Sequence, residues 1–477
     1  MPILTGAEIE RIYEGAVRVL QKIGFRVQNE FILDRLERRG AKVDQASQVF
    51  WPTRQMIHDL EACARRNAGP APDEPVLRRP LPAPETITYN GTLYYDHTEG
   101  QQRAATLRDI EDVLKACHVL SQGSRAVAGR FGPAMTAQDV PPPIEPVESL
   151  ALAIKTTDRV VHRVELILGE QLPYLEALDS INQGREVRYT ANGAAINNFT
   201  MDARAAGTVL ATWQRNGLAR WTTSSCPIAG ASAPVTLAGA VVVGVAETMG
   251  AWFAGWVLNE DVSLQAIPCS GVMDMQTTRA LFSAPEAVLI DVGLYQVFER
   301  VLGVRLGMLA DYCDAKVPGI QAMNDKVFKA LAYAWVTGQL NFHRGTLEAG
   351  KAFSPTQMVI DMEINRELSQ LARGMDVTDE TLALDLIEEY SAGLGRSYLG
   401  AGHTARHFRK VLWRPSLMDR TCWESPQAER EKERAMLEQA EAIWRDALAG
   451  YQRPEVPQEK IKAVDAVLAS ARRRLLA

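Results

Sequence analysis

The stretch "VRLGMLADYCDAKVPGIQAMNDK" at residues 304–326 contains one complete strand–loop–helix unit. Its first part, 304–309, is short and apolar, which is typical of a buried strand. The Pro318–Gly319 break then precedes a helical pattern. Between the two lies a group of polar or reactive side chains, namely Asp311, Tyr312, Cys313, Asp314 and Lys316. Sites of α/β folds lie at the carboxyl ends of parallel strands, so this unit predicts a strand that carries functional groups there.

The same alternation recurs on both sides of this unit. Short apolar runs that favour strands lie at 125–131, 160–168, 187–196, 219–226, 262–269, 304–310, 339–343 and 396–400. Helical patterns lie between them at 145–157, 170–183, 201–216, 234–258, 277–301, 320–337, 354–373 and 380–393. Eight such units predict a parallel sheet closed into a (β/α)8 TIM barrel over residues 105–424. The rival fold is an open doubly wound sheet, which is disfavoured because no G-x-G-x-x-G follows the first strand.

Two further regions flank the predicted barrel. Residues 1–104 form an N-terminal helical module with helices at 5–24, 29–39 and 52–67, a proline-rich connector at 69–85 and a β-hairpin. Thr5 and Glu8 have the spacing of a capping box, and Asn90–Gly91 is expected at the hairpin turn. Residues 425–477 are rich in charged residues and are predicted to form C-terminal helices that pack on the barrel.

Composition excludes some classes of function. The 477-residue chain has a net charge of −6, so it lacks the basic footprint of a nucleic-acid-binding protein. The longest apolar tract, 233–258, carries Glu247 near its middle and is therefore expected to be a buried core helix instead of a membrane span. The six cysteines are scattered without metal-finger spacing, which fits a reduced cytoplasmic protein.

Several motifs resemble the trimethylamine methyltransferase family. They are "PIAGASAPVTLAGAVVVGVAET" at 227–248, "CDAKVPGIQA" at 313–322, "FHRGTLEAG" at 342–350, "MVIDMEI" at 358–364, "HTARHF" at 403–408 and "WRPSLMDR" at 413–420. The resemblance covers nearly the whole chain. It implies a soluble barrel, expected to be a homo-oligomer, that transfers a methyl group from a methylated amine to the cobalt of a partner corrinoid protein. No cofactor need then be bound tightly, because the partner supplies the corrinoid (cobalamin).

The resemblance also bears on the substrate. Family members that carry pyrrolysine use trimethylamine, whereas characterised members without it act on quaternary amines such as glycine betaine. This chain uses only the twenty standard residues. It departs from the family pattern at 258–264 ("LNEDVSL"), at Cys313–Asp314 where Ser-Asp is expected, and at Thr346 where an aromatic residue is usual. Glycine betaine or a related betaine is therefore the expected methyl donor.

The candidate site combines groups at the expected carboxyl ends of the strands. A quaternary cation has no N–H donor, so aromatic faces and carboxylates must hold it. Phe131, Tyr312 and Phe342 could box the ammonium group, and Asp311 and Glu165 could offset its charge. Arg130 and Arg344, with His343, could clamp a substrate carboxylate. Asp311 and His343, which lies in a family motif, are the candidate catalytic residues, and the other six are candidate substrate-binding residues.

Each assignment has a structural alternative. Aromatic residues at strand ends are commonly core packing, and Lys316 with Asp314 could be a surface ion pair. His403 and His407 have helical i, i+4 spacing but lack a third ligand, so no metal site is expected. Asp361 and Glu363, two residues apart on a helix, are expected to point to different sides and to form helix-to-loop salt bridges. Cys226, Cys269 and Cys313 lie near strand ends, where a thiolate nucleophile would need a partner base that the sequence does not identify.

Two other functions remain open at this point. The chain could be a lyase or hydrolase on a carboxylated substrate that uses Asp311, His343 or Lys316. It could also be a barrel that binds a betaine without catalysis. The unusual 258–264 loop is compatible with both.

Overall fold

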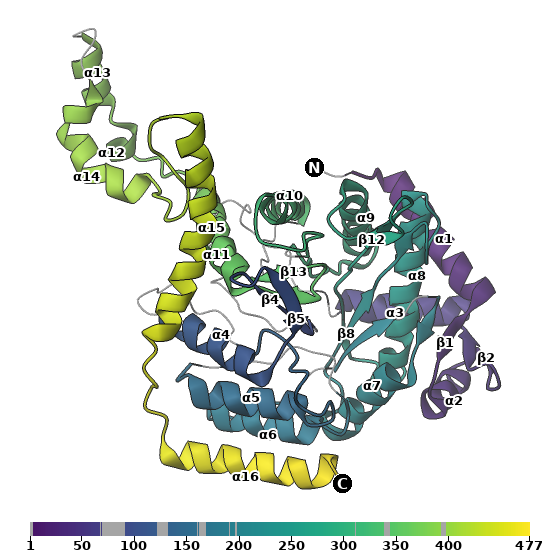
Figure 1. The fold of residues 1–477 in the computed structure, drawn as a ribbon. Helices are drawn as coiled ribbons and strands as arrows, with labels where there is room; N and C mark the ends of the chain where they lie inside the picture. Colours follow the sequence, from purple (N-terminus) through teal and green to yellow (C-terminus); the bar gives the residue numbers. More distant parts are fainter. Residues whose placement is uncertain are drawn as a thin grey trace.

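The structure is a computed structural model that describes residues 3–66, 68, 91–121, 132–159, 161, 168–189, 191–195, 198–310, 312–337, 344–392 and 397–477. Figure 1 shows a mixed α/β molecule in which helices surround small sheets. The described strands form four sheets, with the orders β2-β3-β1-β7, β10-β8-β6, β12-β11-β9 and β13-β14-β4-β5. An alternating α/β fold is therefore confirmed, but hydrogen bonding among these strands does not close a barrel.

The N-terminal part begins with the predicted helices, α1 (Gly6–Ile23), α2 (Glu30–Arg38) and α3 (Arg54–Arg66). The capping box of α1 is confirmed, because the Thr5 amide donates to Glu8 Oε2 at 2.8 Å and the Glu8 amide donates to Thr5 Oγ1. Between these helices lie three strands too short to show a pattern in sequence, β1 (Phe25–Val27), β2 (Lys42–Asp44) and β3 (Val49–Trp51).

The predicted hairpin around Asn90–Gly91 is wrong. Strand β4 (Leu93–Asp96) pairs antiparallel with β5 (Gln101–Ala104), and its other edge pairs with β14 (Ala352–Phe353). Both edges of β4 are thus paired with described strands, and residues 86–89 lie outside the described residues. The Asp96 side chain accepts hydrogen bonds from the amides of Thr98 and Glu99, which forms the turn at the observed place. Asn90 and the proline-rich connector lie outside the described residues.

Three predicted strands form the parallel sheet at the centre of the molecule. They are β6 (Ala191–Ala195), β8 (Arg220–Ser225) and β10 (Ser263–Ala266), paired in parallel on both sides of β8. The short strands β7 (Thr200–Met201), β9 (Ile228–Ala229) and β13 (Thr346–Leu347) are end strands of the other three sheets. These parallel pairs confirm the predicted β–α alternation in this part of the chain.

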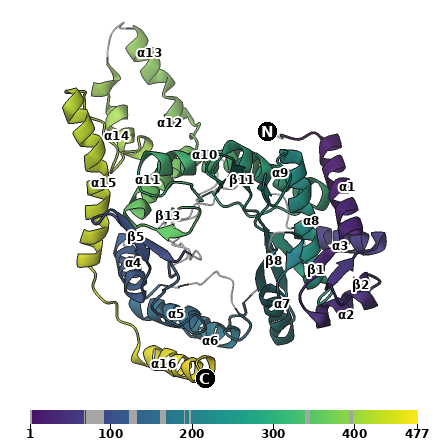
Figure 2. The ribbon, with the colours of Figure 1, turned by 45° about the vertical axis from the view of Figure 1, so that its right-hand side comes forward.

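Most of the predicted helices are confirmed. They are α5 (Glu145–Thr156), α6 (Leu172–Gln183), α7 (Ala203–Asn216), α8 (Leu237–Trp256), α10 (Ile320–Thr337) and α11 (Pro355–Ala372). Figure 2 shows α5 to α11 around a common centre in chain order, together with α4 (Leu107–Leu120), which the sequence analysis missed. The signal for α4 was a capping box, since Thr106 and Asp109 bond each other's backbone amides.

Four predicted elements differ from the structure, two in their extent and two in their type. The expected helix at 277–301 begins only at Pro285 as α9 (Pro285–Leu302), after a hairpin of β11 (Gly271–Asp274) and β12 (Arg279–Leu281). The expected helix at 380–393 is divided into α12 (Asp379–Leu382) and α13 (Leu384–Ala392), because Ala383 has a φ of 50°. Residues 304–310 do not form the expected regular strand, although the Gly307 amide donates a hydrogen bond to Ala266 O at 3.0 Å. Residues 398–400 form a 3-10 turn capped by Ser397 instead of a strand.

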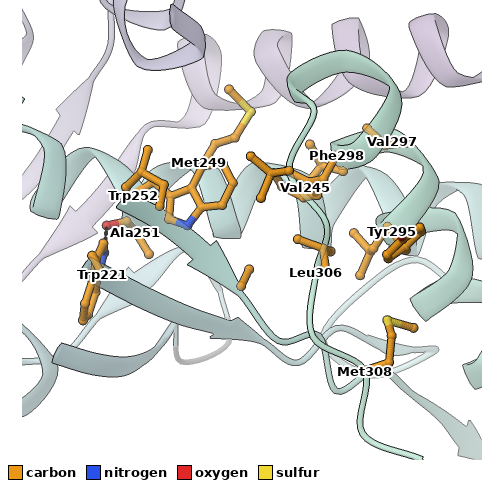
Figure 3. Close-up of a cluster of buried hydrophobic side chains, with 14 of the residues drawn as sticks. Trp221, Val245, Met249, Ala251, Trp252, Tyr295, Val297, Phe298, Leu306 and Met308 are labelled. Atoms are coloured by element: carbon orange, nitrogen blue, oxygen red, sulfur yellow. Dashed lines mark hydrogen bonds between the residues drawn. The ribbon is translucent and has the colours of Figure 1, made fainter. Parts of the chain in front are cut away.

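The core is built around α8, as expected from its composition. Helix α8 packs against α1, α9 and β8. The Trp221 ring fits between two glycines, because an added Cβ would lie 2.4 Å from it at Gly193 and 2.5 Å at Gly255. Trp221 Nε1 also donates to Ala251 O at 2.9 Å (Figure 3). Helix α8 is long and apolar enough to cross a membrane by length and composition, but most of it is buried inside the protein.

The C-terminal helices pack on the outside of helices α4 to α11, which surround the common centre. Helix α15 (Pro426–Ala449) packs against α4 and α11, and α16 (Gln458–Leu475) packs against α5 and α6. Figure 1 shows α12, α13 and α14 (Gly402–Val411) at one corner, away from the central sheet.

Candidate functional site

The described chain contains only part of the predicted site. Tyr312 and Arg344 are described, and both are at least half-buried. Arg130, Phe131, Glu165, Asp311, Phe342 and His343 lie outside the described residues, as do the predicted strands 125–131 and 339–343. Of the predicted site residues, only Tyr312 and Arg344 therefore have surroundings that the structure describes.

Tyr312 and Arg344 lie on neighbouring backbone segments. The Ala349 amide donates to Cys313 O at 2.7 Å, and the Glu348 amide donates to Ala315 O at 2.8 Å. The buried Cys313 thiol contacts Thr346 O at 3.5 Å. These bonds join segment 312–315 to segment 344–349. The Cys313 thiol thus contacts the neighbouring backbone segment.

Asp314 holds the loop before α9 in place. Its carboxylate accepts hydrogen bonds from the amides of Phe282 and Ser283, each at 2.8 Å. Ser283 Oγ donates in turn to Tyr312 O at 2.9 Å. Lys316 Nζ bonds the main-chain oxygen of Asp314 instead of its carboxylate. Of the alternatives for Lys316, an ion pair with Asp314 is therefore wrong, since the Asp314 carboxylate bonds the amides of Phe282 and Ser283.

An aromatic and cationic corner surrounds Tyr312. Its ring makes an edge contact with Phe282 at a centroid distance of 6.0 Å. The buried Lys329 Nζ lies 5.9 Å from the Tyr312 ring and 5.6 Å from the Tyr333 ring, and it donates to Phe282 O at 3.0 Å. One direction of approach to Tyr312 is thus taken by a cation.

A buried carboxylate lies behind this corner. Asp291 Oδ1 accepts from the Ser270 amide at 2.9 Å, and Oδ2 accepts from Tyr333 Oη at 2.6 Å. Burial raises the pKa of Asp291, and the positive charge of Lys329 opposes that rise. Sequence reasoning missed Asp291, Lys329 and Tyr333 because it searched strand ends, whereas these residues come from α9 and α10. The polar i, i+4 pair Lys329 and Tyr333 on a largely apolar helix was the signal that could have found them.

A second buried network holds the segment that carries Arg344. Lys326 and Asp361 form an ion pair in which both side chains are fully excluded from solvent. Asp361 also accepts from the Gly345 amide at 2.7 Å and from Gln357 Nε2 at 2.7 Å. Lys326 Nζ lies 3.4 Å from Thr346 Oγ1. Lys326, which follows the motif at 313–322, therefore meets residues of the motifs at 342–350 and 358–364. The predicted helix-to-loop salt bridges are wrong, because Asp361 pairs with Lys326 of α10 and Glu363 with Arg366 of its own helix. The contacts of these two carboxylates with loops are hydrogen bonds from the amides of Gly345 and Ser416.

Glu247 forms a third buried polar contact, beyond the end of β6. Its Oε1 accepts from the Phe199 amide at 3.3 Å, and no partner for Oε2 is found within the described part of the chain. Burial raises the pKa of Glu247 to about 7. The residues that it contacts, Asn198 and Phe199, both have left-handed backbone conformations, with φ of 68° and 56°. Glu247 is therefore a buried acid that holds a strained turn.

The two histidines of α14 lie far along the chain from these networks. Their rings are 4.3 Å apart, and His407 Nε2 lies 3.2 Å from Glu380 Oε1. Among the described residues, no group of three or more His, Cys, Asp or Glu side chains is arranged to hold a metal ion. The nearest acidic neighbour of His407 is thus the Glu380 carboxylate.

Comparison with known proteins covers the full chain. A family model described as trimethylamine methyltransferase (MTTB) matches residues 1–475. Trimethylamine methyltransferase MttB of Desulfitobacterium hafniense (strain DSM 10664 / DCB-2) is 24% identical over 464 residues, which covers 96% of this chain and 91% of that protein. Glycine betaine methyltransferase of Desulfitobacterium hafniense (strain Y51) is 24% identical over 481 residues, covering 96% and 94%. Trimethylamine methyltransferase MttB2 of Methanosarcina mazei is 27% identical over 249 residues, covering 52% and 49%.

Proposed function

The chain belongs to the trimethylamine methyltransferase family, and on that premise we propose that it transfers a methyl group from a quaternary amine to Co(I) of a partner corrinoid protein. The proposed donor is glycine betaine or a related betaine. The observation that carries this proposal is similarity along almost the whole chain to a glycine betaine methyltransferase, together with a sequence of standard residues only.

The chemistry of the leaving group favours a quaternary donor. A quaternary nitrogen leaves as a neutral tertiary amine and needs no proton, whereas trimethylamine needs protonation or capture by an electrophile. The corrinoid enters as the acceptor substrate and supplies the cobalt nucleophile. The residues of this chain then have to orient the methyl group and hold the cation. Groups that hold a cation without donating hydrogen bonds are aromatic faces and carboxylates.

Residues for these tasks are proposed as follows. The Tyr312 ring, with Phe131 and Phe342, contacts the ammonium group, and Glu165 and Asp311 offset its charge. Arg344, with Arg130 and His343, binds the carboxylate, while Asp311 and His343 act nearest the reacting methyl group. The backbone bonds between segments 312–315 and 344–349 support a shared role for Tyr312 and Arg344. Lys329 Nζ already lies 5.9 Å from the Tyr312 ring, so the ammonium group is proposed to approach that ring from the side away from Lys329.

Membership of the trimethylamine methyltransferase family also bears on the architecture of the chain. We propose that the chain forms a (β/α)8 barrel over 105–424, with an N-terminal module over 1–104 and helices over 425–477. The arrangement of α4 to α11 around one centre in chain order supports this proposal (Figure 2). A cytoplasmic homo-oligomer is proposed by analogy with the family.

The test is a methyl-transfer assay with reduced cobalamin and a panel of amines. Loss of the Co(I) absorbance with glycine betaine or another quaternary amine, but not with trimethylamine, is the expected result. No loss with any quaternary amine or sulfonium compound would overturn the proposal. Calorimetric binding without transfer, even with a cognate corrinoid protein, would indicate a binding barrel, and product formed without cobalamin would indicate a lyase or hydrolase.

Tyr312 provides a sharper test of cation binding. Tyr312→Leu removes the aromatic face and is expected to raise KM about tenfold, since a desolvated cation–π contact contributes roughly 1–2 kcal/mol. Tyr312→Phe keeps the face and is the matched control, with KM close to that of the wild type. Equal KM values for both variants would contradict a role of the ring in binding the ammonium group. The KM measurement is accompanied by a thermal melt of each variant.

A further inference from the structure

The six cysteines fall into three groups. Cys63, Cys117 and Cys313 are buried, and their thiols contact Val262 O at 3.5 Å, Met358 Sδ at 3.3 Å and Thr346 O at 3.5 Å. Cys422 is exposed. Cys226 and Cys269 are both half-buried. Only this last pair is partly accessible and also comes from adjacent strands.

The strand register brings Cys226 and Cys269 side by side. In the parallel pairing of β8 with β10, Trp221 lies opposite Leu264 and Thr223 opposite Ala266. The pairing continues beyond the strand ends, because the amides of Ile267 and Cys269 donate to Thr223 O and Ser225 O at 2.9 and 3.1 Å. The same offset places Cys269 opposite Cys226. Neighbouring strands lie about 4.8 Å apart, within the roughly 4.4–6.8 Å that Cα atoms of a disulfide span.

The Cys226 thiol also influences the protonation of Cys269. The bond from Cys269 to Cys226, together with burial and the nearby Asp291 carboxylate, raises the pKa of the Cys269 thiol, and Lys329 opposes the rise. The Cys269 thiol therefore keeps its proton, and the strand register places the Cys226 sulfur beside it. Such a pair has one sulfur placed to attack and a second placed to resolve the product.

We propose that Cys226 and Cys269 are a modification site that closes reversibly to a disulfide in the presence of a peroxide. The Cys226 sulfur attacks one peroxide oxygen, which gives a sulfenic acid and releases one water. The Cys269 sulfur then displaces the hydroxyl group, the S–S bond forms, and a second water leaves with the thiol proton. The two sulfurs supply the two electrons that reduce the peroxide. A small dithiol reverses the reaction by exchange.

Closure would act on the corner beside Tyr312. Cys269 precedes Ser270, whose amide bonds Asp291, and Asp291 bonds Tyr333. A disulfide would pull residues 269 and 270 toward β8 and change the surroundings of Lys329. The oxidised protein is therefore expected to lose the proposed methyl-transfer activity and to regain it with dithiothreitol. This modification goes beyond the proposed function, and its chemical readout does not depend on any catalytic assay.

The experiment is a hydrogen peroxide titration of the full chain. Remaining thiols are alkylated in denaturant, and the protein is digested without reduction and analysed by mass spectrometry. The expected product is a peptide pair joined through Cys226 and Cys269 that disappears after dithiothreitol. Cys226→Ser and Cys269→Ser abolish it, whereas Cys313→Ser, the matched control for a single buried thiol, retains it.

Two outcomes would overturn the proposal. One is that Cys226 and Cys269 are both alkylated at a peroxide dose that already oxidises the exposed Cys422. The other is that they are oxidised separately to sulfinic acids without a linked peptide. Since the linked peptide forms in the wild-type chain, a folding defect in a serine variant does not affect this result. If the linked peptide forms in a protein that transfers no methyl group, the proposed function is contradicted and the proposed disulfide is not.

Discussion

Lys326 and Asp361 each depend on the other to remain charged at a site without solvent. Both side chains are fully buried, and the carboxylate also holds the Gly345 amide. Breaking a buried ion pair by removing one partner typically costs about 3–5 kcal/mol, because the other charge is left uncompensated. Asp361→Asn is therefore expected to lower the free energy of unfolding by about that amount in a urea titration.

The matched controls separate charge from packing. The double variant Lys326→Met/Asp361→Leu removes both charges and is expected to recover much of the lost stability. Arg434→Met breaks the exposed Arg434–Glu438 pair and is expected to leave unfolding unchanged within error. If Asp361→Asn unfolds at the wild-type urea concentration, the buried pair is not what holds this segment.

Glu247 predicts a pH dependence of stability. Burial raises its pKa from an ordinary value of 4.5 to about 7, so the folded state favours the protonated acid. Its contribution to stability is fully present below pH 4.5 and is lost as the pH rises to about 7, by about 1.4 kcal/mol per pH unit. Glu247→Gln stays neutral, so its stability relative to the wild type should rise across this window in melts at a series of pH values.

The comparison with the variant isolates Glu247 from other buried acids. Burial also raises the pKa of Asp179, to about 6, but that acid is present in both proteins and its effect cancels. The difference between the two stability curves should be flat below pH 4.5 and above about pH 7. Parallel curves through the whole range would show that Glu247 does not titrate in this window.

At the scale of elements, the close approach of helix α8 to strand β1 depends on glycine. A Cβ added at Gly250 would lie 2.2 Å from Phe25 Cδ2, and Phe25 is itself fully buried. Gly250→Ala is therefore expected to destabilise the protein by about 1–3 kcal/mol through overpacking, despite the better helix propensity of alanine. Thermal unfolding measures the effect.

Gly207 in α7 is the matched control for Gly250. It also lies inside a helix, but an added Cβ would meet nothing within 4 Å. Gly207→Ala is expected to stabilise the protein by about 0.4–1 kcal/mol, because it restricts the unfolded chain without a clash. Equal shifts for both variants would mean that the contact with Phe25 is not tight.

Elements with a strong local signal were predictable, and those fixed by long-range pairing were not. The capping box at Thr5 and the apolar composition of α8 led to the correct helices. The hairpin of β11 and β12 was missed because its strands depend on pairing with each other and with β9. The β4 hairpin was misplaced because Asn90–Gly91 is a common turn sequence, whereas the observed turn depends on Asp96 side-chain bonds.

At the scale of the whole molecule, the site follows the same division. Tyr312 and Arg344 were predicted from strand ends, and the structure describes both on segments, 312–315 and 344–349, that share backbone hydrogen bonds. Asp291, Lys329 and Tyr333 were not reached, because only tertiary packing brings α9 and α10 against the end of β10. A single sequence does not contain that packing in a local pattern. The meeting of Lys326, Gly345 and Asp361 likewise joins three segments that sequence reasoning kept apart.

The packing of α1 on α8 and α9 affects how the protein folds during its synthesis on the ribosome. Helix α1 ends at Ile23, and α8 begins only at Leu237, more than two hundred residues later. At roughly 5–20 residues per second, about 10–50 s pass between the synthesis of α1 and that of α8, against which the apolar face of α1 packs. Throughout that interval the nascent chain carries an uncovered amphipathic helix at its leading end. A holding chaperone that binds such helices would therefore meet this protein long before its core can form.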